Sequence, residues 1–299
     1  MITVKLSGGL GNQMFQYAMA RSLALKKNTK VKLDLTTLNH RLPGRGYVFR
    51  TYDLDFFNLG AEFSLLSKFS KYFKNIAFIL SKIQIGIKNK LLPGSVFKEK
   101  EYYLYDPEIF KTSEHVYLDG FWQSKKYFED YEDIIRQEFS FHLPLSAKAQ
   151  ELSEKILNSQ SVCINIRRGD YVSMKSNADF FGILPLEYFQ QGIEMIKQKV
   201  NNPYFFIFTD DMKWCQENFN LSENTFFVSN DYSGERYIDK FHLMTLCRHF
   251  IIPNSTYGWW AAWLSSNKEK IVIAPKKWIT DEKLNNNTKD LIPDSWIRI

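Results

Sequence analysis

Cysteine is scarce in this chain of 299 residues, which has only Cys163, Cys215 and Cys247. Three widely spaced cysteines do not form a disulfide framework, so we expect a reducing compartment. The chain also lacks any run of about 18 apolar residues, and its start, MITVKLSGGLGN, lacks the basic-then-apolar pattern of a secretory signal. We therefore expect a cytoplasmic protein that is soluble or attached at most to the inner membrane face.

The sequence also lacks a metal-binding pattern and a strong positive charge. No His and Cys cluster has metal-ligand spacing, and the D-x-D string at Asp53–Asp55 has no glycine turn beside it, so we expect no metal ion. The net charge of +6, from 39 basic and 33 acidic residues, is too small to indicate nucleic acid but suits a small anionic ligand or an anionic surface.

The composition is that of a globular protein, with 44% hydrophobic and 24% charged residues. Aromatic residues make up 16% of the chain. They fit either an aromatic core or rings that stack on sugars or bases, and composition does not separate the two.

Two stretches of the sequence have the pattern of a parallel α/β sheet. In the first, the strand at 2–6 leads through a glycine turn into a helix that ends near residue 27, and a strand at 30–35 follows. The second stretch has continuously apolar strands, as expected when helices cover both faces. Its strands are predicted at 161–167, 204–209, 225–228, 250–253 and 270–274, with helices at 186–200, 212–219, 235–248 and 257–266. We predict an N-terminal α/β domain at 1–145 and a Rossmann-like C-terminal domain at 146–299.

Paired arginines give the strongest local signal. Arg167 and Arg168 lie in INIRRGDY, at the end of the first strand of the second domain, where open α/β sheets bind ligands. Guanidinium groups bind phosphate oxygens in a bidentate manner. The alternative is a surface pair bridged to Asp170.

Two further strand ends carry candidate ligand groups. Ser255 and Thr256 begin an all-apolar helix in IIPNSTYGWWAAWL, and a helix N-terminus attracts anions. Its tryptophans are expected in the core. Asp210, in FTDD, can accept the N1–H and 2-amino donors of guanine, although helix capping is the alternative for this string.

The segment GGLGNQ at Gly8–Gln13 meets neither the G-x-G-x-x-G nor the P-loop fingerprint. Its glycines allow close approach of a ligand, and the amides of Asn12 and Gln13 suit sugar hydroxyls or phosphate.

Together, GGLGNQMFQYA, RRGDY, NSTYGWWAAWL and IVIAPKKW resemble glycosyltransferase family 11, the bacterial relatives of galactoside α-1,2-fucosyltransferases, in order and spacing from residue 4 to about residue 297. The resemblance implies a GT-B-type fold of two Rossmann-like α/β domains facing a cleft. It also implies GDP-β-L-fucose as the donor and inversion at the anomeric carbon. The implied acceptor is a terminal β-galactoside of a surface glycan such as lipid-linked O-antigen or lipopolysaccharide.

The resemblance also implies roles for individual residues. Arg167 and Arg168 would hold the pyrophosphate with help from Ser255 and Thr256. Asp210 would read guanine and Asn12 would lie near the reacting sugar, with no metal or other cofactor required. Two positions depart from the family pattern, which usually has His at Asn165, a predicted nucleotide contact, and Ser at Gly258.

The mechanism and the class of protein leave alternatives open. Arginines, a helix dipole and backbone donors can replace a metal ion in stabilising the leaving GDP. Asp170 is a predicted catalytic residue and, with Glu187, a candidate general base, although it can also orient the arginines. A GT-B transferase with another nucleotide sugar and a non-catalytic carbohydrate-binding protein are the alternative functions.

Residues 61–93 form a basic segment with six lysines and Glu62 as the one acid. Phe69, Phe73, Ile76, Ile79 and Ile83 recur in it at helical spacing. One interpretation is an amphipathic helix on an anionic membrane. The other is a helix that packs on the domain and turns a solvated lysine face outward.

Overall fold

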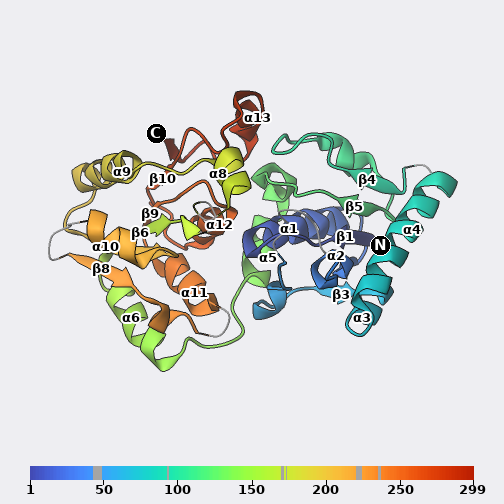
Figure 1. The fold of residues 1–299 in the computed structure, drawn as a ribbon, viewed down its shortest axis with the longest axis horizontal. Helices are drawn as coiled ribbons and strands as arrows, with labels where there is room; N and C mark the ends of the chain where they lie inside the picture. The colour runs from blue at the N-terminus through green and yellow to red at the C-terminus, as the bar shows by residue number, and fades with distance from the viewer. Residues whose placement is uncertain (43–48, 93, 170–171, 173, 220–223, 235–236) are drawn as a thin grey trace. The chain divides into compact units, whose positions relative to one another are not determined.

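The chain divides into two compact units in the computed structural model (Figure 1). The first unit contains Met1–His142 and Asn286–Leu291, and the second contains Leu143–Asn285 and Ile292–Ile299. The predicted boundary after residue 145 is close to this division, but the short return of the chain to the first unit was not predicted. The structure describes residues 1–42, 49–92, 94–169, 172, 174–219, 224–234 and 237–299.

The first unit has a five-stranded parallel sheet in the order β3-β2-β1-β5-β4. The two strands predicted near the start of the chain are confirmed as β1 and β2, whereas the short strands β3, β4 and β5 carry no distinct sequence signal. The strands are β1 (Ile2–Lys5), β2 (Val31–Asp34), β3 (Ala61–Phe63), β4 (Val96–Lys98) and β5 (Tyr117–Asp119).

Helix α1 is buried along most of its length, which explains its lack of a polar face. It begins after Gly8, whose φ of 76° is accessible to glycine at little cost, and it ends with Lys26, a cation in its last turn. The described helices of this unit are α1 (Leu10–Lys26), α2 (Thr36–Asn39), α3 (Leu65–Ser70), α4 (Lys74–Leu91) and α5 (Glu132–Glu138), with 3₁₀ turns at Leu54–Phe56, Pro107–Lys111, Lys125–Tyr127, Glu129–Tyr131 and Thr288–Asp290.

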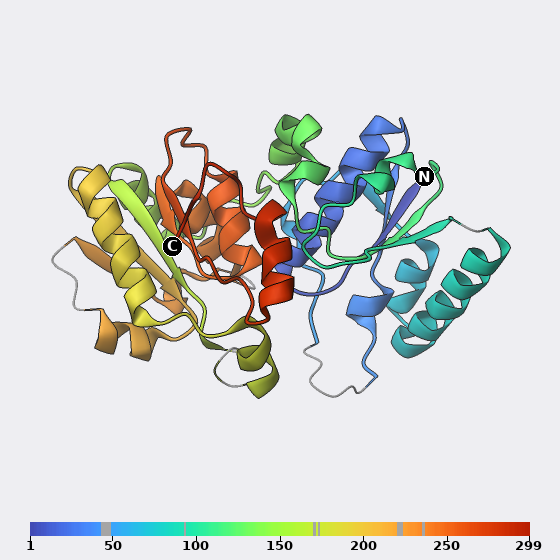
Figure 2. The ribbon, with the colours of Figure 1, turned by 90° about the horizontal axis from the view of Figure 1, so that it is seen from above.

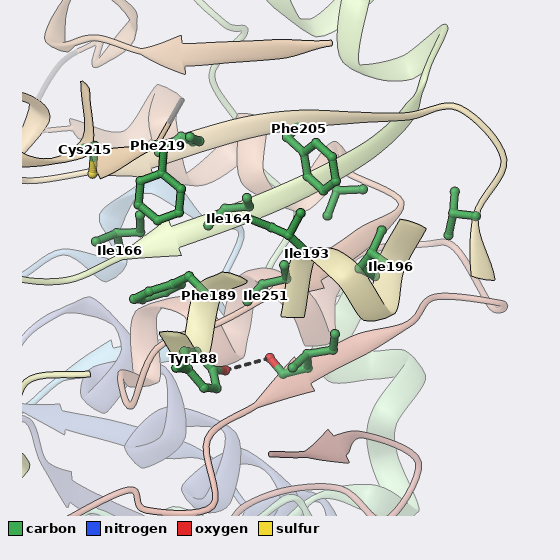
Figure 3. Packing of buried hydrophobic residues seen from close by; sticks show 14 residues of the cluster. Ile164, Ile166, Tyr188, Phe189, Ile193, Ile196, Phe205, Cys215, Phe219 and Ile251 are labelled. Carbon is green, nitrogen blue, oxygen red and sulfur yellow. Dashed lines mark hydrogen bonds between the residues drawn. The ribbon is translucent and has the colours of Figure 1, made fainter. Parts of the chain in front are cut away.

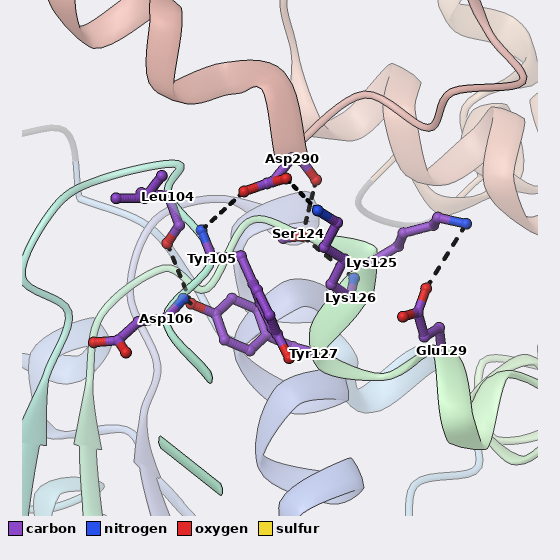
Figure 4. Close-up of polar contacts among 9 residues, drawn as sticks. All are labelled: Leu104, Tyr105, Asp106, Ser124, Lys125, Lys126, Tyr127, Glu129 and Asp290. Atoms are coloured by element: carbon purple, nitrogen blue, oxygen red, sulfur yellow. Dashed lines mark hydrogen bonds and ion pairs between the residues drawn. The ribbon is translucent and has the colours of Figure 1, made fainter. Parts of the chain in front are cut away.

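The returning segment is fixed to the first unit by polar contacts (Figure 4). The backbone carbonyl of Asp290 accepts a hydrogen bond of 2.8 Å from the Ser124 hydroxyl, and its carboxylate pairs with Lys126. The backbone N–H of Tyr105 donates to the same carboxylate. The next residue, Leu291, is fully buried. The segment is therefore a structural part of this unit.

The second unit has a six-stranded parallel sheet in the order β11-β10-β9-β6-β7-β8. All five strands predicted from the apolar runs are present within a few residues. The strands are β6 (Gln160–Ile166), β7 (Pro203–Thr209), β8 (Thr225–Val228), β9 (His249–Ile251), β10 (Val272–Ala274) and β11 (Ile297–Arg298).

Helices cover this second sheet, and the four that were predicted are confirmed. The described helices are α6 (Ala147–Leu157), α8 (Lys175–Phe181), α9 (Leu186–Lys199), α10 (Met212–Asn218), α11 (Ile238–Leu246) and α12 (Thr256–Leu264), with a 3₁₀ turn at Asn230–Tyr232. The helix α13 (Glu282–Asn287) begins in this unit, and its last two residues belong to the first unit.

Two groups of side chains form the core of the second unit. Phe189 and Ile193 of α9 pack on Ile164 and Ile251 of the sheet, and the Tyr188 hydroxyl donates to the carbonyl of Ile273 in β10 (Figure 3). The predicted burial of the α12 tryptophans is also confirmed: Trp259, Trp260 and Trp263 are at most 4% exposed and pack ring against ring.

The basic segment at 61–93 forms α3 and α4, which pack on the rest of the unit, and its lysines at 68, 71, 74, 82 and 90 are exposed. Both features fit the interpretation of a packed helix with a solvated lysine face, but the apolar side chains at helical spacing do not supply the packed face. Instead Phe69, Phe73, Ile76, Ile79 and Ile83 are exposed, and the buried residues of the two helices are Ser67, Ser70, Ala77 and Ser81. Small and polar side chains form the packed face because they allow close contact with the neighbouring α2.

Candidate functional site

Three adjacent strands of the second sheet end at one edge and carry most of the predicted site residues. β6 lies between β9 and β7, and all three run in the same direction. The carboxyl end of β6 leads into Arg167–Arg168, that of β7 into Asp210–Asp211 and that of β9 into Asn254–Ser255. The parallel register therefore brings together residues that are 42 to 88 positions apart in the sequence.

Asp210 is the centre of the contacts at this edge. One carboxylate oxygen, Oδ1, accepts the backbone N–H of Arg168 at 2.8 Å and that of Gly169 at 3.0 Å. The other oxygen pairs with Arg167 Nη1 at 2.6 Å. A Cβ on Gly169 would lie 2.8 Å from this second oxygen, so glycine is required for the turn to close on Asp210. The observed contacts favour a role in ordering the arginine turn; the guanine-reading role stays a prediction.

Arg168 is oriented by two residues that the sequence analysis did not single out. Its Nε donates to Asp211 Oδ2 at 3.2 Å, and its guanidinium lies 3.9 Å from the ring centroid of Trp214. Asp211 also accepts the backbone N–H of Trp214, so the helix cap considered for FTDD is Asp211 and not Asp210. A guanidinium has five N–H donors, and only one of those of Arg168 is bonded to a described residue, Asp211, so the others can bind an anion.

Asn165 lies inside the sheet edge, only 7% exposed. Its amide donates to the carbonyl of Phe208 at 3.3 Å and so connects β6 with β7. A Cβ on Gly258 of α12 would lie 2.8 Å from Asn165 Oδ1. The two departures from the family pattern are therefore in contact, and the Asn165 contacts favour a structural role over the predicted nucleotide contact.

The start of α12 supplies the third part of the edge. Ser255 is the N-cap residue, although its side chain does not cap the helix, and Thr256 is the first helical residue. Asn254 is buried and donates to the carbonyls of Phe181 and Trp278, which fixes the turn before the helix. The first N–H groups of a helix and its positive dipole end favour an anion here.

Lys240 is a further cation that the sequence did not reveal. It lies on α11, is 8% exposed and donates to Asn230 Oδ1 at 2.9 Å. Burial lowers the pKa of Lys240, while the negative charge of Asp210 acts in the opposite direction. Because Lys240 interacts electrostatically with Asp210, its charge would also act on an anionic ligand bound at this edge.

The first unit holds Asn12 at the carboxyl edge of its own sheet. The Asn12 side-chain oxygen accepts from Gln123 Nε2 at 3.0 Å, and Gly8 closely approaches the Asn12 amide. Gln13 is fully buried and spans from Gly8 to Thr51 and Asp53. The amide of Gln13 is therefore a structural link, and Asn12 is the more exposed of the two.

Glu99 is a second acid that the sequence analysis missed. It follows β4, and its two oxygens accept the backbone N–H groups of Phe121 at 2.7 Å and Trp122 at 3.1 Å. Burial raises the pKa of Glu99 to about 7. Its carboxyl group holds the loop after β5, whose residue Trp122 has a left-handed φ of 57°. A lone glutamate after a short strand gives no sequence signal of this role.

The remaining candidates from the sequence are acids. Asp170 lies outside the described residues. Glu187 is exposed in the first turn of α9, where an acid stabilises a helix through its dipole. The carboxylate of Asp53 accepts from the Thr51 hydroxyl at 2.6 Å. In the part of the chain that the structure describes, no three His, Cys, Asp or Glu side chains gather in a way that could hold a metal ion.

Two parallel α/β units, one of them carrying arginines and a helix N-terminus at the carboxyl edge of its sheet, place the protein in the class of Rossmann-like α/β proteins. Within this class, the sequence profile of Glycosyl transferase family 11 matches residues 1–299, and the chain belongs to that family. The protein is thus a glycosyltransferase, as the motifs predicted.

Two Escherichia coli proteins resemble the chain over its length. Alpha-1,2-colitosyltransferase is 34% identical over 306 residues, covering 100% of this chain and 98% of that protein. The O-antigen biosynthesis glycosyltransferase WbnK is 30% identical over 307 residues, covering 98% and 99%. Galactoside alpha-(1,2)-fucosyltransferase 2 of Bos taurus is 30% identical over 167 residues, which cover 54% of this chain and 48% of that protein.

A solved structure confirms the predicted fold class. The fucosyltransferase NodZ from Bradyrhizobium aligns with a TM-score of 0.51 over 87% of this chain and 91% of its own, at 15% sequence identity. The chain therefore has the GT-B-type fold of two parallel α/β units. Among the described residues, no helix is both long enough and apolar enough to span a bilayer.

Proposed function

We propose that the protein is an inverting galactoside α-1,2-fucosyltransferase. It transfers L-fucose from GDP-β-L-fucose to the 2-hydroxyl of a terminal β-galactoside. The observation that carries this proposal is the arginine turn after β6, where Asp210 orders Arg167 and Arg168 beside the start of α12. Family membership and the α-1,2 specificity in the names of related proteins support the linkage.

In this proposal the second unit binds the donor. Arg167 and Arg168 hold the pyrophosphate, and Ser255 with Thr256 adds hydrogen bonds from the start of α12. These groups stabilise the negative charge that develops on GDP as the glycosidic bond breaks. No metal ion or other cofactor is required, because fixed cations and backbone dipoles provide that charge stabilisation.

The first unit is proposed to present the acceptor. Asn12 lies at the edge of its sheet and has an amide suited to a sugar hydroxyl. Two full-length relatives, one of them named for O-antigen biosynthesis, support a bacterial surface glycan, O-antigen or lipopolysaccharide, as the acceptor. Such a glycan can be lipid-linked when it meets a cytoplasmic enzyme.

A second donor is favoured by one observation. The relative that is 34% identical over the whole chain is named as a colitosyltransferase, and colitose is L-fucose without its 3-hydroxyl. GDP-colitose would bind through the same diphosphate and guanine. The two donors differ only in the 3-hydroxyl of the sugar. If the pocket has a polar group that bonds this hydroxyl, that group is left without a partner when GDP-colitose binds, and the enzyme then strongly prefers GDP-fucose.

The test is a donor comparison with defined products. The protein is incubated with GDP-fucose or GDP-colitose, a panel of galactoside-terminated oligosaccharides and excess EDTA, and the product linkage is determined by NMR. The proposal expects a higher kcat/KM for GDP-fucose and a new linkage at the galactose 2-hydroxyl.

Four outcomes would contradict parts of this proposal. Preference for GDP-colitose would reassign the donor, and a different linkage would reassign the acceptor position. Turnover that only Mg²⁺ or Mn²⁺ restores would reject the metal-free mechanism. Glycan binding without turnover or GDP binding would indicate a carbohydrate-binding protein.

A further inference from the structure

The helices α3 and α4 lie side by side at an edge of the first unit (Figures 1 and 2). The outward face of α4 and the turn before it are apolar. The side chains of this face are between 43% and 72% exposed, a high value for large apolar groups that recur every three or four residues. They are Phe73, Ile76, Ile79, Leu80, Ile83, Ile87 and Leu91.

The opposite face of α4 explains this orientation. Ala77 and Ser81 are buried, and the Thr36 hydroxyl donates to Ser81 Oγ at 3.1 Å. The rings of His40 and Phe78 stack with centroids 4.1 Å apart. Two small side chains, one of them hydrogen-bonded, and the Phe78 ring thus attach α4 to the unit, and its other large apolar side chains stay available to another apolar phase.

The same surface extends over α3 and the turn that follows it. Leu65 is 81% exposed and Tyr72 is 76% exposed. Phe69 is also exposed and stacks on Phe73, with centroids 4.8 Å apart. The apolar surface is therefore continuous from α3 to α4.

The charges around this surface are positive and favour an anionic partner. Lysines occupy positions 68, 71, 74, 82, 88 and 90, and the sequence has no Asp or Glu from residue 63 to residue 98. A second copy of the chain would bring the same lysines into opposition. An anionic lipid surface offers both the opposite charge and an apolar phase, and each lysine near it raises partitioning about fivefold.

We propose that the α3–α4 surface, Leu65–Leu91, docks on an anionic lipid bilayer. α4 lies in the plane of the interface with its apolar face among the acyl chains and its lysines at the headgroups. Its lysines exclude a spanning orientation, in agreement with the absence of a membrane-crossing helix among the described residues. This inference depends on neither the donor nor the acceptor proposed above.

The experiment is flotation of the full chain with vesicles. Vesicles of 30% phosphatidylglycerol in phosphatidylcholine are compared with pure phosphatidylcholine at low and high salt. The apolar variant carries Ile76→Ser, Ile83→Ser and Ile87→Ser, and the charge variant carries Lys71→Gln, Lys74→Gln and Lys82→Gln. The matched controls change the same number of exposed residues of the second unit: Leu143→Ser, Leu157→Ser and Ile183→Ser, or Lys199→Gln, Lys213→Gln and Lys277→Gln.

We expect the wild type and both controls to float with the anionic vesicles at low salt and less at high salt. Each α3–α4 variant should lose at least tenfold in partitioning, and circular dichroism should show that it remains folded, because the changed side chains are exposed. Absence of wild-type flotation, or equal loss in the controls, would overturn the proposal. So would sedimentation showing a dimer that the apolar variant abolishes while flotation is unchanged, because the occupant would then be a second copy.

Discussion

Replacing Asp210 tests whether this carboxylate orders the arginine turn or reads the guanine base. Asp210→Asn keeps a side-chain oxygen that can accept from the backbone N–H groups of Arg168 and Gly169, but it removes the negative charge opposite Arg167. Asp210→Ala removes all three contacts. The two variants therefore separate the ion pair from the turn.

The structure sets the expected size of each effect. Both partners of the Arg167–Asp210 pair are about one-third exposed, so the pair contributes about 0.5 kcal/mol. The two backbone hydrogen bonds add about 0.7 kcal/mol each at the lower end of the usual range. If the order of the turn limits GDP binding, Asp210→Asn should weaken it about twofold and Asp210→Ala about 25-fold.

The assay is calorimetric binding of GDP and of ADP to each variant, with Glu194→Gln as a control that removes a surface carboxylate paired with Lys197. An ordering role predicts that both nucleotides weaken together. A bidentate contact to guanine would instead contribute about 1.5–3 kcal/mol. Loss of GDP affinity by tenfold or more in Asp210→Asn, with ADP unaffected, would refute the ordering role and support guanine recognition.

Three further predictions concern the remaining site residues. Arg167→Ala and Arg168→Ala should each reduce kcat by about 10²–10³ in a folded protein, and near-normal turnover in steady-state kinetics would make that arginine structural. Gly258→Ala should lower the free energy of unfolding by about 1–3 kcal/mol in urea, because its Cβ would lie 2.8 Å from Asn165 Oδ1. Adding Asn165→Ala should recover part of this loss. If the effects of the two substitutions on the unfolding free energy are strictly additive, the contact is contradicted. The pKa of Glu99 is raised to about 7, so its favourable contribution is full below about pH 4.5 and is lost as the pH rises to 7. Urea midpoints at pH 5 and pH 8 should accordingly differ less in Glu99→Gln than in the wild type, and an equal difference would show that another group titrates.

The sequence alone determined the fold class and the location of the principal motifs. Continuous apolar runs such as YFFIFT predicted strands covered on both faces, and the structure has β7 there. The all-apolar helix after Asn254 was predicted to be core, and its tryptophans are buried. These predictions succeeded because hydrophobic periodicity and run length are local properties of the chain.

The role of individual polar residues was decided by tertiary structure. FTDD fitted either a helix cap or a guanine contact. Asp211 caps α10 through a local bond to Trp214, whereas Asp210 holds the arginine turn only because β6 pairs with β7. Glu99 gave no signal, because its partners Phe121 and Trp122 are more than 20 residues away. A carboxylate's role depends on which strand ends are neighbours, and strand order is not encoded in a local pattern.

The orientation of α4 shows the same division. Helical spacing in the sequence predicted an amphipathic helix, and it is present over Lys74–Leu91. Periodicity defines an apolar face but not the direction in which that face points. Contacts of Ser81 and Phe78 with α2 and His40 turn the apolar face outward. The sequence thus determined that this helix has two different faces, and only the packing of the first unit decided which of them remains exposed.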